Sequence, residues 1–550
     1  MNTRYFTITD PVRDRARIAE AAEILRGGGL LAVPTETVYG LGADGLDPDA
    51  VRRIFVAKGR PQDNPLILHI PDALWLARYC VNIPETAYRL AERFWPGPLT
   101  MILPKADCVP LVTTGGLDTV GVRCPDHAVT RAIIEAAGVP VAAPSANTSG
   151  RPSCTTAAHV REDMDGRIDG VVDGGPCRVG VESTIVDLTC DPPRLLRPGG
   201  LPLEELRAVL GTVAVDKAVT QQLAEGERPR APGMKYRHYA PRAEVTVVTG
   251  PPRASARYLL SHVGEGSGVI CFDEFAPLFA GNTVRRLGAA DDKAAQARRV
   301  FDALRAFDET QVRDIWAQCP DGTGLGLAVE NRLKKAAGFR TADAGRDLTV
   351  IGITGGTGAG KTTLLRALER RGAAVFDCDA VYHELLRTSA ALRGEIAAAF
   401  GDVFAPDGDL DRKKLGTIVF GNADRLARLD AAVFKYLPRE LARRMDGCGR
   451  ELIALDAIKL TESGLAALCD LTVAVTAPEE SRMRRIMLRD GISEEYARAR
   501  IAAQRGEREF RTACGAVFEN AYPTAEEAGA AADEFLNAVI EKIKEERSHG

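Results

Sequence analysis

Short apolar runs alternate with amphipathic stretches along the first 200 or so residues of the chain. Runs of this length indicate buried strands, while apolar positions three and four apart indicate helices. The expected strands are Gly29–Val33, Leu66–Ile70, Thr100–Leu103, Val139–Ala143 and Ser183–Leu188. The expected helices are Ile18–Arg26, Ala87–Phe94 and Val129–Ala137. Mixed strands and helices predict an α/β domain.

Two later parts repeat this alternation. The middle part has strand-like Val245–Thr249 and Gly268–Phe272 and helix-like Lys293–Ala306 and Ala328–Ala337, which predicts a small Rossmann-like α/β domain. The last part has apolar runs at Leu348–Ile353, Glu451–Leu455 and Leu471–Thr476, with helix-forming Thr362–Arg371 after the first. Such runs are typical of a parallel sheet covered by helices on both faces.

Periodicity is lost in two stretches that fill with Pro, Gly and charged residues, Glu225–Arg242 and Thr341–Asp347. Such segments cannot bury enough apolar surface to offset their ordering entropy, so they predict linkers. The expected division is a domain over 1–212, a linker over 213–242, a domain over 243–340, a linker over 341–347 and a domain over 348–550.

Composition supports several cores and excludes some classes of protein. The chain has 550 residues, of which 45% are hydrophobic and 27% charged, and its net charge is −4. That length is too great for one core, and that charge argues against stable nucleic-acid binding. No apolar run approaches the ~18 residues of a membrane span. The 12 cysteines are scattered without a Cys-x-x-Cys pair, which indicates reduced thiols. We therefore expect a cytoplasmic protein that does not associate with a membrane.

A phosphate-binding motif opens the last part. Gly355 to Thr362 reads G-x-x-x-x-G-K-T between a predicted strand and a predicted helix, which is the context the motif requires. Its glycines let successive N–H groups and the helix N-terminus face a triphosphate. Lys361 would reach the β- and γ-phosphates of ATP, and the Thr362 hydroxyl would hold Mg²⁺. The alternative is a glycine-rich turn with an accidental Lys-Thr.

Carboxylates follow the next strands. Asp379 comes after Phe376 at the carboxyl edge of a short strand, where ligands of open α/β sheets bind. It could accept a proton from an acceptor hydroxyl, help to hold Mg²⁺, or serve as the N-cap of helical Ala380–Leu386. Asp456 ends an apolar run as a Walker-B carboxylate would. A later group of arginines predicts either a solvated basic helix or a lid over the phosphoryl group: Arg482, Arg484, Arg485, Arg489, Arg498, Arg500 and Arg505.

From about Leu348 to the C-terminus the chain resembles dephospho-coenzyme A kinase. The resemblance rests on TGGTGAGKT, FDCDAVYHELL, DGDLDRKKLGTIVF, LDAIKLTESGL and RDGISEEYARARIAAQ. It implies a P-loop kinase in which Asp379, Lys361 and Arg489 are catalytic, Asp379 by activating the 3′-hydroxyl of dephospho-CoA. It also implies an ATP site made of Gly355, Gly358, Ala359, Gly360, Lys361, Thr362 and Thr363. Phe434-Lys435 and Cys514-Gly515 depart from the family pattern of His-Pro and Ala-Asp.

Cations and hydroxyls gather at the strand ends of the first part. Pro34-Thr35-Glu36-Thr37 follows the first expected strand, Lys58-Gly59-Arg60 follows a helix, and Ser145 to Gly150 follow a third apolar segment. This combination indicates an anionic ligand. Because the sequence shows no Ser/His/Asp triad and no metal cluster, we expect catalysis by positioning and charge neutralisation.

The stretch from about Gly28 to Gly200 resembles the YrdC-type threonylcarbamoyl-adenylate synthases. The later strings PGMKYRHYAP and GLGLAVENRLKKAAG resemble the long, two-domain version of that family. The resemblance implies that L-threonine, bicarbonate and ATP give threonylcarbamoyl-AMP and pyrophosphate with Mg²⁺, for a downstream transferase that forms t6A in tRNA. The implied threonine site is Thr37, His69, Arg123 and Ser183. The implied ATP site is Lys58, Arg60, Asn64, Thr119, Ala143, Ser145, Asn147, Ser153 and Arg197, with Tyr236 as a gate.

The leading hypothesis is therefore a fusion of two ATP-using enzymes. One alternative is a tRNA-binding module joined to a nucleotide switch, which the acidic composition and the lack of an Asn-Lys-x-Asp motif disfavour. Another is a fusion in which one domain is inactive, for which Phe434-Lys435 is the sequence support.

Overall fold

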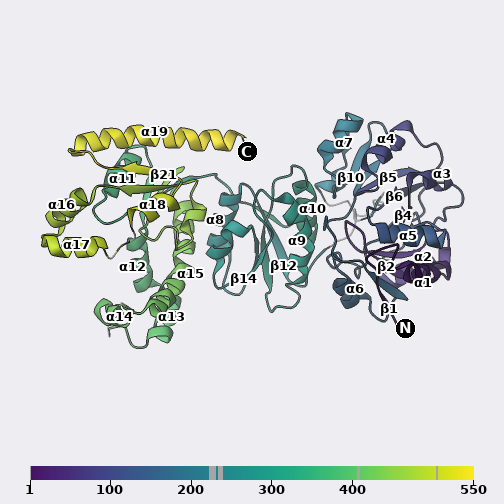
Figure 1. The fold of residues 1–550 in the computed structure, drawn as a ribbon, viewed down its shortest axis with the longest axis horizontal. Coiled ribbons are helices and arrows are strands. Elements are labelled where there is room, and N and C mark those ends of the chain that lie inside the picture. Colours follow the sequence, from purple (N-terminus) through teal and green to yellow (C-terminus); the bar gives the residue numbers. More distant parts are fainter. Residues whose placement is uncertain are drawn as a thin grey trace. The chain divides into compact units, whose positions relative to one another are not determined.

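The computed structural model describes residues 2–221, 231–232, 239–405, 409–419, 421–502, 504 and 506–549 (Figure 1). The chain forms two compact units. The first unit consists of Met1–Thr249, Gly266–Asp273 and Thr283–Ala342. The second unit consists of Gly250–Glu265, Glu274–Asn282 and Asp343–Gly550. No helix in the described part of the chain combines the length and the apolar character that a membrane span needs.

The first unit contains a mixed sheet of 11 strands among its described residues, in the order β1-β8-β2-β3-β7-β4-β6-β5-β9-β10-β11. The strands are β1 (Arg4–Thr7), β2 (Leu31–Val33), β3 (Gly40–Asp44), β4 (Ile67–His69), β5 (Leu99–Pro104), β6 (Thr119–Arg123), β7 (Val141–Ala142), β8 (Gly170–Asp173), β9 (Thr184–Asp187), β10 (Arg194–Arg197) and β11 (Ala214–Val215). The α-helices are α1 (Arg15–Arg26), α2 (Pro48–Lys58), α3 (Leu76–Tyr79), α4 (Glu85–Phe94), α5 (Ala128–Ala137), α6 (Ala157–Met164) and α7 (Leu203–Leu210), with 3-10 turns η1 (Ala73–Trp75) and η2 (Lys217–Val219).

The strands and helices expected in this part are present, but β1, β3, β6, β8, β10 and β11 are not among the five runs named. β3 shows the physical reason most clearly. Its sequence GLGAD lacks the β-branched residues that favour strands. The structure explains the glycines: a Cβ on Gly42 would lie 2.7 Å from the Val141 side chain of neighbouring β7. Close approach of the two strands therefore requires glycine, at the expense of strand propensity.

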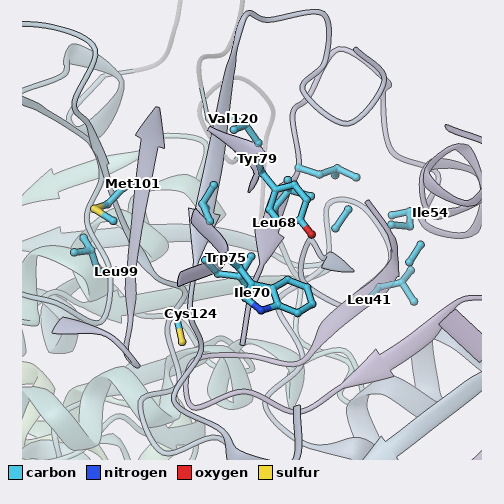
Figure 2. Packing of buried hydrophobic residues seen from close by; sticks show 14 of the residues in the cluster. Leu41, Ile54, Leu68, Ile70, Trp75, Tyr79, Leu99, Met101, Val120 and Cys124 are labelled. Atoms are coloured by element: carbon cyan, nitrogen blue, oxygen red, sulfur yellow. The ribbon is translucent and has the colours of Figure 1, made fainter. Parts of the chain in front are cut away.

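The strands that carry the predicted site residues pack against a hydrophobic core. Figure 2 shows Leu41 of β3, Leu68 of β4, Met101 of β5, Val120 of β6 and Trp75 of η1 as members of one buried cluster. All of these side chains are buried. Because the interior is close-packed, it holds the strand ends, and the polar residues at them, in fixed places.

A second sheet of five strands follows, in the order β14-β13-β15-β12-β16. The elements are β12 (Glu244–Thr249), α8 (Pro252–His262), β13 (Gly268–Cys271), η3 (Asp273–Phe279), β14 (Thr283–Arg286), α9 (Lys293–Arg305), β15 (Asp314–Gln318), α10 (Gly326–Ala336) and β16 (Thr341–Asp343). Neighbouring strands from β12 to β15 pair in parallel. We call residues 244–343 the middle segment. Its α8 belongs to the second unit, where it packs against α15 (Ala423–Gly447).

Both predicted linkers contain ordered residues, contrary to expectation. Residues 341–343 form edge strand β16, whose pairing with β12 compensates for the low apolar content. In the other stretch, the described Ala231 and Tyr239 are buried, and the Tyr239 ring lies 5.0 Å from that of Phe301 in α9. Local composition could not show these contacts because both depend on distant segments.

The second unit is built on a parallel sheet in the order β18-β19-β17-β20-β21. Its strands are β17 (Thr349–Thr354), β18 (Ala374–Asp377), β19 (Leu452–Asp456), β20 (Leu471–Thr476) and β21 (Ala516–Glu519). Its other helices are α11 (Lys361–Arg370), α12 (Cys378–Thr388), α13 (Ala390–Phe400), α14 (Arg412–Val419), η4 (Leu465–Leu468), α16 (Glu479–Asp490), α17 (Glu494–Ala502), α18 (Glu507–Ala513) and α19 (Ala525–His549). Helices α11 and α19 lie side by side (Figure 1), and their buried side chains form one cluster with those of β17 and β20. The expected α/β fold class is confirmed.

Candidate active sites

A cavity in the first unit brings together residues that are far apart in sequence. Predicted site residues on its wall are Lys58, Arg60, His69, Arg123, Ala143, Ser145, Asn147, Ser183 and Arg197. Thr35, Glu182 and Tyr239 also line it, although the sequence did not single them out as ligands. Four cations in the lining, Lys58, Arg60, Arg123 and Arg197, make the cavity suited to a polyanion.

Lys58 is placed by the end of α2. Gly59 terminates this helix with a left-handed backbone (φ 63°), and the Arg60 N–H then donates to the Phe55 carbonyl at 2.9 Å. The Lys58 ammonium donates to the backbone carbonyls of Ser145 and Asn147 on the opposite loop. Burial lowers the pKa of Lys58 to about 7. This ammonium thus joins two parts of the wall.

Arg123 and His69 lie side by side because β4 and β6 pair in parallel with these residues in register. Arg123 is buried, and its Nη2 lies 2.7 Å from Oε2 of the equally buried Glu36. Burial, together with the nearby charge of Arg123, lowers the pKa of His69 to about 3, so this imidazole is neutral. Glu36 was not predicted as a site residue. The sequence feature that could have identified Glu36 is an acidic residue between hydroxyl residues directly after a strand, in Pro34-Thr35-Glu36-Thr37.

Other predicted ligands lie behind the lining rather than on it. The Thr37 hydroxyl is hydrogen-bonded to that of Thr35 at 2.8 Å, and the Ser153 hydroxyl donates to Glu182 at 2.6 Å. Asn64 Oδ1 is buried and accepts no hydrogen bond from the described residues. Thr119, at the start of β6, is half-buried. Tyr236 lies outside the described residues.

Glu182 is the one carboxylate among the described residues that line this cavity. Arg332 of α10 donates to it from Nε at 2.7 Å. Burial alone would raise the pKa of Glu182, but Arg332, Arg197 and the Ser153 hydroxyl outweigh burial and lower the pKa to about 2. Arg197 also donates to the Ser183 carbonyl, at 3.0 and 3.2 Å. The carboxylate is therefore ionised and held by guanidinium groups.

In the second unit the phosphate-loop motif lies between central strand β17 and helix α11, as predicted. Gly355 has a φ of 150°, and a Cβ there would lie 2.3 Å from the Val475 carbonyl oxygen, so only glycine fits. Gly360 (φ 92°) precedes α11 in the left-handed region. The Lys361 ammonium lies 2.6 Å from Oδ1 of Asp456 at the end of β19. The loop, Lys361 and Asp456 thus share one edge of the sheet.

The structure corrects one interpretation of Asp379. The N-cap of α12 is Asp377, whose carboxylate accepts the N–H groups of Asp379 and Ala380 at 2.9 and 3.0 Å. Asp379 lies in the first turn of α12, and its side chain does not cap the helix. Burial and the neighbouring Asp377 raise the pKa of the Asp379 carboxyl. A carboxylate with a raised pKa is a better proton acceptor.

Some of the arginines from the predicted lid lie against the phosphate loop. Arg482 donates to the Thr357 carbonyl at 3.0 Å and Arg485 to that of Ala359 at 3.1 Å. Arg489 lines the hollow at Lys361 and Thr362. Arg484, Arg498 and Arg500 are exposed, and Arg505 lies outside the described residues. Arg482 and Arg485 are thus held against the loop, whereas Arg489 is exposed and forms an ion pair with Asp490 at 2.7 Å.

A mostly apolar cavity of about 390 Å³ opens beside Asp379. Lys459 lines it and is held by Asp430 at 2.7 Å. The family departure at 434–435 falls here: Phe434 lines the cavity, whereas Lys435 forms an ion pair with Glu395 of α13. Gly515, at the other departure, packs on Leu471 away from this cavity, where a Cβ would come within 2.8 Å of that side chain.

Three family models match the chain in succession. The model Sua5_yciO_yrdC, described as telomere recombination, matches residues 23–199. The threonylcarbamoyl-AMP synthase C-terminal domain matches residues 201–338. Dephospho-CoA kinase matches residues 349–526.

Individual relatives divide the chain in the same way. Threonylcarbamoyl-AMP synthase from Pyrococcus abyssi is 50% identical over 346 residues, which are 61% of this chain and 98% of the relative. Dephospho-CoA kinase from Streptomyces avermitilis is 37% identical over 178 residues, 32% of this chain and 87% of the relative. A crystal structure of P. abyssi Sua5 complexed with L-threonine superposes with a TM-score of 0.58 and 49% identity, covering 62% of this chain and 99% of that one. Since the two relatives align nearly complete on successive parts of one polypeptide, each over a part that contains a formed cavity, the chain belongs to the threonylcarbamoyl-AMP synthase family and, through its last part, to the dephospho-CoA kinase family.

Proposed function

We propose that this chain is a bifunctional enzyme. Its first activity converts L-threonine, bicarbonate and ATP into threonylcarbamoyl-AMP and pyrophosphate, and its second phosphorylates the 3′-hydroxyl of dephospho-CoA with ATP. Residues 1–212 and 243–340 serve the first activity and residues 348–550 the second. The observation that carries this proposal is the formation of a separate, cation-rich site in each part.

In the synthase reaction, the carbamate formed from threonine's amine and bicarbonate attacks the α-phosphorus of ATP, and pyrophosphate leaves. Arg123 would bind the threonine carboxylate: it lines the cavity, with Glu36 2.7 Å from its Nη2 and the Gly97 carbonyl 3.3 Å from its Nε. Neutral His69, with Thr37 and Ser183, would complete the threonine site. The complex of P. abyssi Sua5 with L-threonine supports this substrate.

The nucleotide would lie along the cations of the same cavity. Lys58, Arg60 and Arg197 would offset the charge of the phosphates and of the leaving pyrophosphate, and the side chains of Lys58 and Arg197 are buried. Asn64, Thr119, Ala143, Ser145, Asn147 and Ser153 would hold the rest of the nucleotide, and Tyr236 would close over it. The product would pass to a transferase that modifies tRNA.

In the kinase reaction, the phosphate loop from Gly355 to Thr363 would hold ATP, with Lys361 at the β- and γ-phosphates. Dephospho-CoA would occupy the cavity beside Asp379, which would accept the proton of its 3′-hydroxyl as the oxygen attacks the γ-phosphorus. Arg482, Arg485 and Arg489 of α16 would stabilise the charge of the transferring group.

Mg²⁺ fits the kinase site. Asp456 Oδ1 is buried with the Lys361 ammonium 2.6 Å away, and the Asp456 carboxylate and the Thr362 hydroxyl together offer hard oxygen ligands of the kind Mg²⁺ prefers. The metal would neutralise charge on the phosphates. In the synthase cavity the one lining carboxylate is held by Arg332, so Mg²⁺ there would be bound chiefly by the ATP phosphates.

The proposal is tested by giving the purified full-length chain ATP and one co-substrate set at a time. We expect pyrophosphate with threonine plus bicarbonate, and ADP with dephospho-CoA. Omitting threonine or bicarbonate is the control for the first reaction, and CoA in place of dephospho-CoA is the control for the second. Pyrophosphate without ADP would indicate an inactive kinase, the alternative for which the Phe434-Lys435 departure is the sequence support.

A further inference from the structure

Two buried arginines of the middle segment reach into the first part of the chain within the first unit. Arg332 of α10 is fully buried and donates to Glu182, while its Nη1 donates to neighbouring Asn331 Oδ1 at 2.9 Å. Arg305, at the end of α9, is 4% exposed and donates to both carboxylate oxygens of Asp163, at 3.0 and 3.1 Å. Burial of a guanidinium is costly unless it is paired. Both arginines therefore form specific contacts rather than chance ones.

Both contacts converge on one loop of the predicted nucleotide site. Arg305 also donates to the Pro152 carbonyl at 2.6 Å, and Asp163 accepts the Thr148 N–H at 2.9 Å. Glu182, held by Arg332, accepts the Ser153 hydroxyl. The loop from Ser145 to Ser153, which also receives the Lys58 ammonium, is thus held at several points.

The charge of Glu182 makes the Arg332 contact more than structural. A bare carboxylate on the wall of a cavity that takes ATP would repel its phosphates. The groups that face Glu182 are Arg332, Arg197, Lys335, Tyr239 and Ser153. Arg197 is predicted to bind ATP, whereas Arg332 is not. Arg332 can therefore neutralise Glu182 while Arg197 binds the nucleotide.

We propose that Arg332 and Arg305 are positioning residues of the synthase, through which the middle segment completes the ATP-binding wall: Arg332 neutralises and orients Glu182, and Arg305 fixes the loop through Asp163. This proposal rests on the proposed synthase function. The site is therefore composite, since a chain lacking the middle segment would present Glu182 to the nucleotide without the Arg332 guanidinium.

The test measures pyrophosphate release by full-length variants, a readout to which the kinase does not contribute because it forms ADP. We expect Arg332→Met to raise the KM for ATP at least tenfold, with a threonine KM within about threefold of wild type. In Arg332→Met/Glu182→Gln the uncompensated charge is absent, so the KM for ATP should return to within about threefold of Glu182→Gln alone. Arg305→Met should also raise the KM for ATP.

Lys334→Met is the matched control, because Lys334 lies on the same helix but pairs with Glu330, four residues earlier. It should leave both KM values unchanged. Thermal unfolding and ADP formation by the same preparations check folding. An Arg332→Met enzyme with a wild-type KM for ATP, or a double variant with no recovery, would overturn the neutralising role.

A wild-type chain that releases no pyrophosphate would instead refute the proposed synthase reaction. Arg332 would then be tested by ATP binding to Lys361→Ala chains, in which the phosphate loop is disabled. Weaker ATP binding by Arg332→Met/Lys361→Ala, with recovery on adding Glu182→Gln, would support the positioning role. Unchanged binding would reject it.

Discussion

The two proposed phosphate-binding sites of this chain are built in opposite ways. In the second unit, one continuous segment from β17 to α11 supplies the loop, its lysine and the helix N-terminus. In the first unit, the cations come from α2 and the turn after it, from β6 and from β10, and their positions depend on carbonyls and carboxylates elsewhere in the chain. A local site tolerates changes in distant segments, whereas a dispersed site depends on every segment that holds it.

The sharpest test of this contrast is Lys361→Ala. We expect kinase activity to fall at least ~10³-fold, because this lysine is the charge that reaches the β- and γ-phosphates. Pyrophosphate release by the synthase should stay within a few-fold of wild type. Loss of both activities in a chain that remains folded would show that the two sites are not independent.

Asp379→Asn separates catalysis from helix capping. It keeps the shape of the side chain but removes the proton acceptor, so kcat of the kinase should fall by about 10²–10⁴ while ATP binding changes little. The control is Asp377→Asn, since Asp377 is the actual N-cap and Asn caps nearly as well. If Asp379→Asn leaves kcat within a few-fold of wild type, Asp379 is not the base.

Arg123 tests the dispersed site. Arg123→Ala would leave the Glu36 carboxylate buried without its partner, at about 3–5 kcal/mol of folding free energy. The cleaner variant is Arg123→Met/Glu36→Gln. Losing a charge-assisted hydrogen bond of about 1.5–3 kcal/mol should raise the threonine KM roughly ten- to hundredfold, with little change in the KM for ATP. Equal changes in both values would assign Arg123 to the nucleotide.

The smallest expected effect is a pH dependence. The pKa of Lys58 is lowered to about 7, so its positive charge is lost as pH rises through that value, and the synthase KM for ATP should increase by a few-fold between pH 6.5 and 8.5. Because the unfolded chain keeps this proton up to about 10.4, the Lys58 contribution to stability should rise with pH over the same interval. The check is the KM profile of Lys58→Met, which should lack the increase.

A second lysine provides the control for that profile. Burial also lowers the pKa of Lys335 to about 7, but this residue lies behind Glu182 rather than on the cavity wall. Lys335→Met should therefore keep the pH-dependent KM. If Lys335→Met abolishes it and Lys58→Met does not, the titrating group has been assigned to the wrong lysine.

Prediction from sequence succeeded where the signal is local. The phosphate loop, the strand before it and the helix after it were all found, because glycine spacing and short apolar runs act over neighbouring residues. It failed at Asp379, where the choice between two aspartates two residues apart depends on which carboxylate meets the helix N–H groups. It also missed β3, because Gly42 is required by the close approach of neighbouring β7 and lowers the strand propensity of β3 itself.

The sequence by itself determined the two enzyme families, the α/β class and the candidate ligands at strand ends, since these follow from motifs and periodicity within short windows. Only the tertiary structure decided which charges are paired. Glu36 with Arg123, and Glu182 with Arg332, are separated by 87 and 150 residues respectively, and no local pattern links them. The reason is physical: a buried carboxylate must find a cation, and the fold, not the neighbouring sequence, determines which one is within reach.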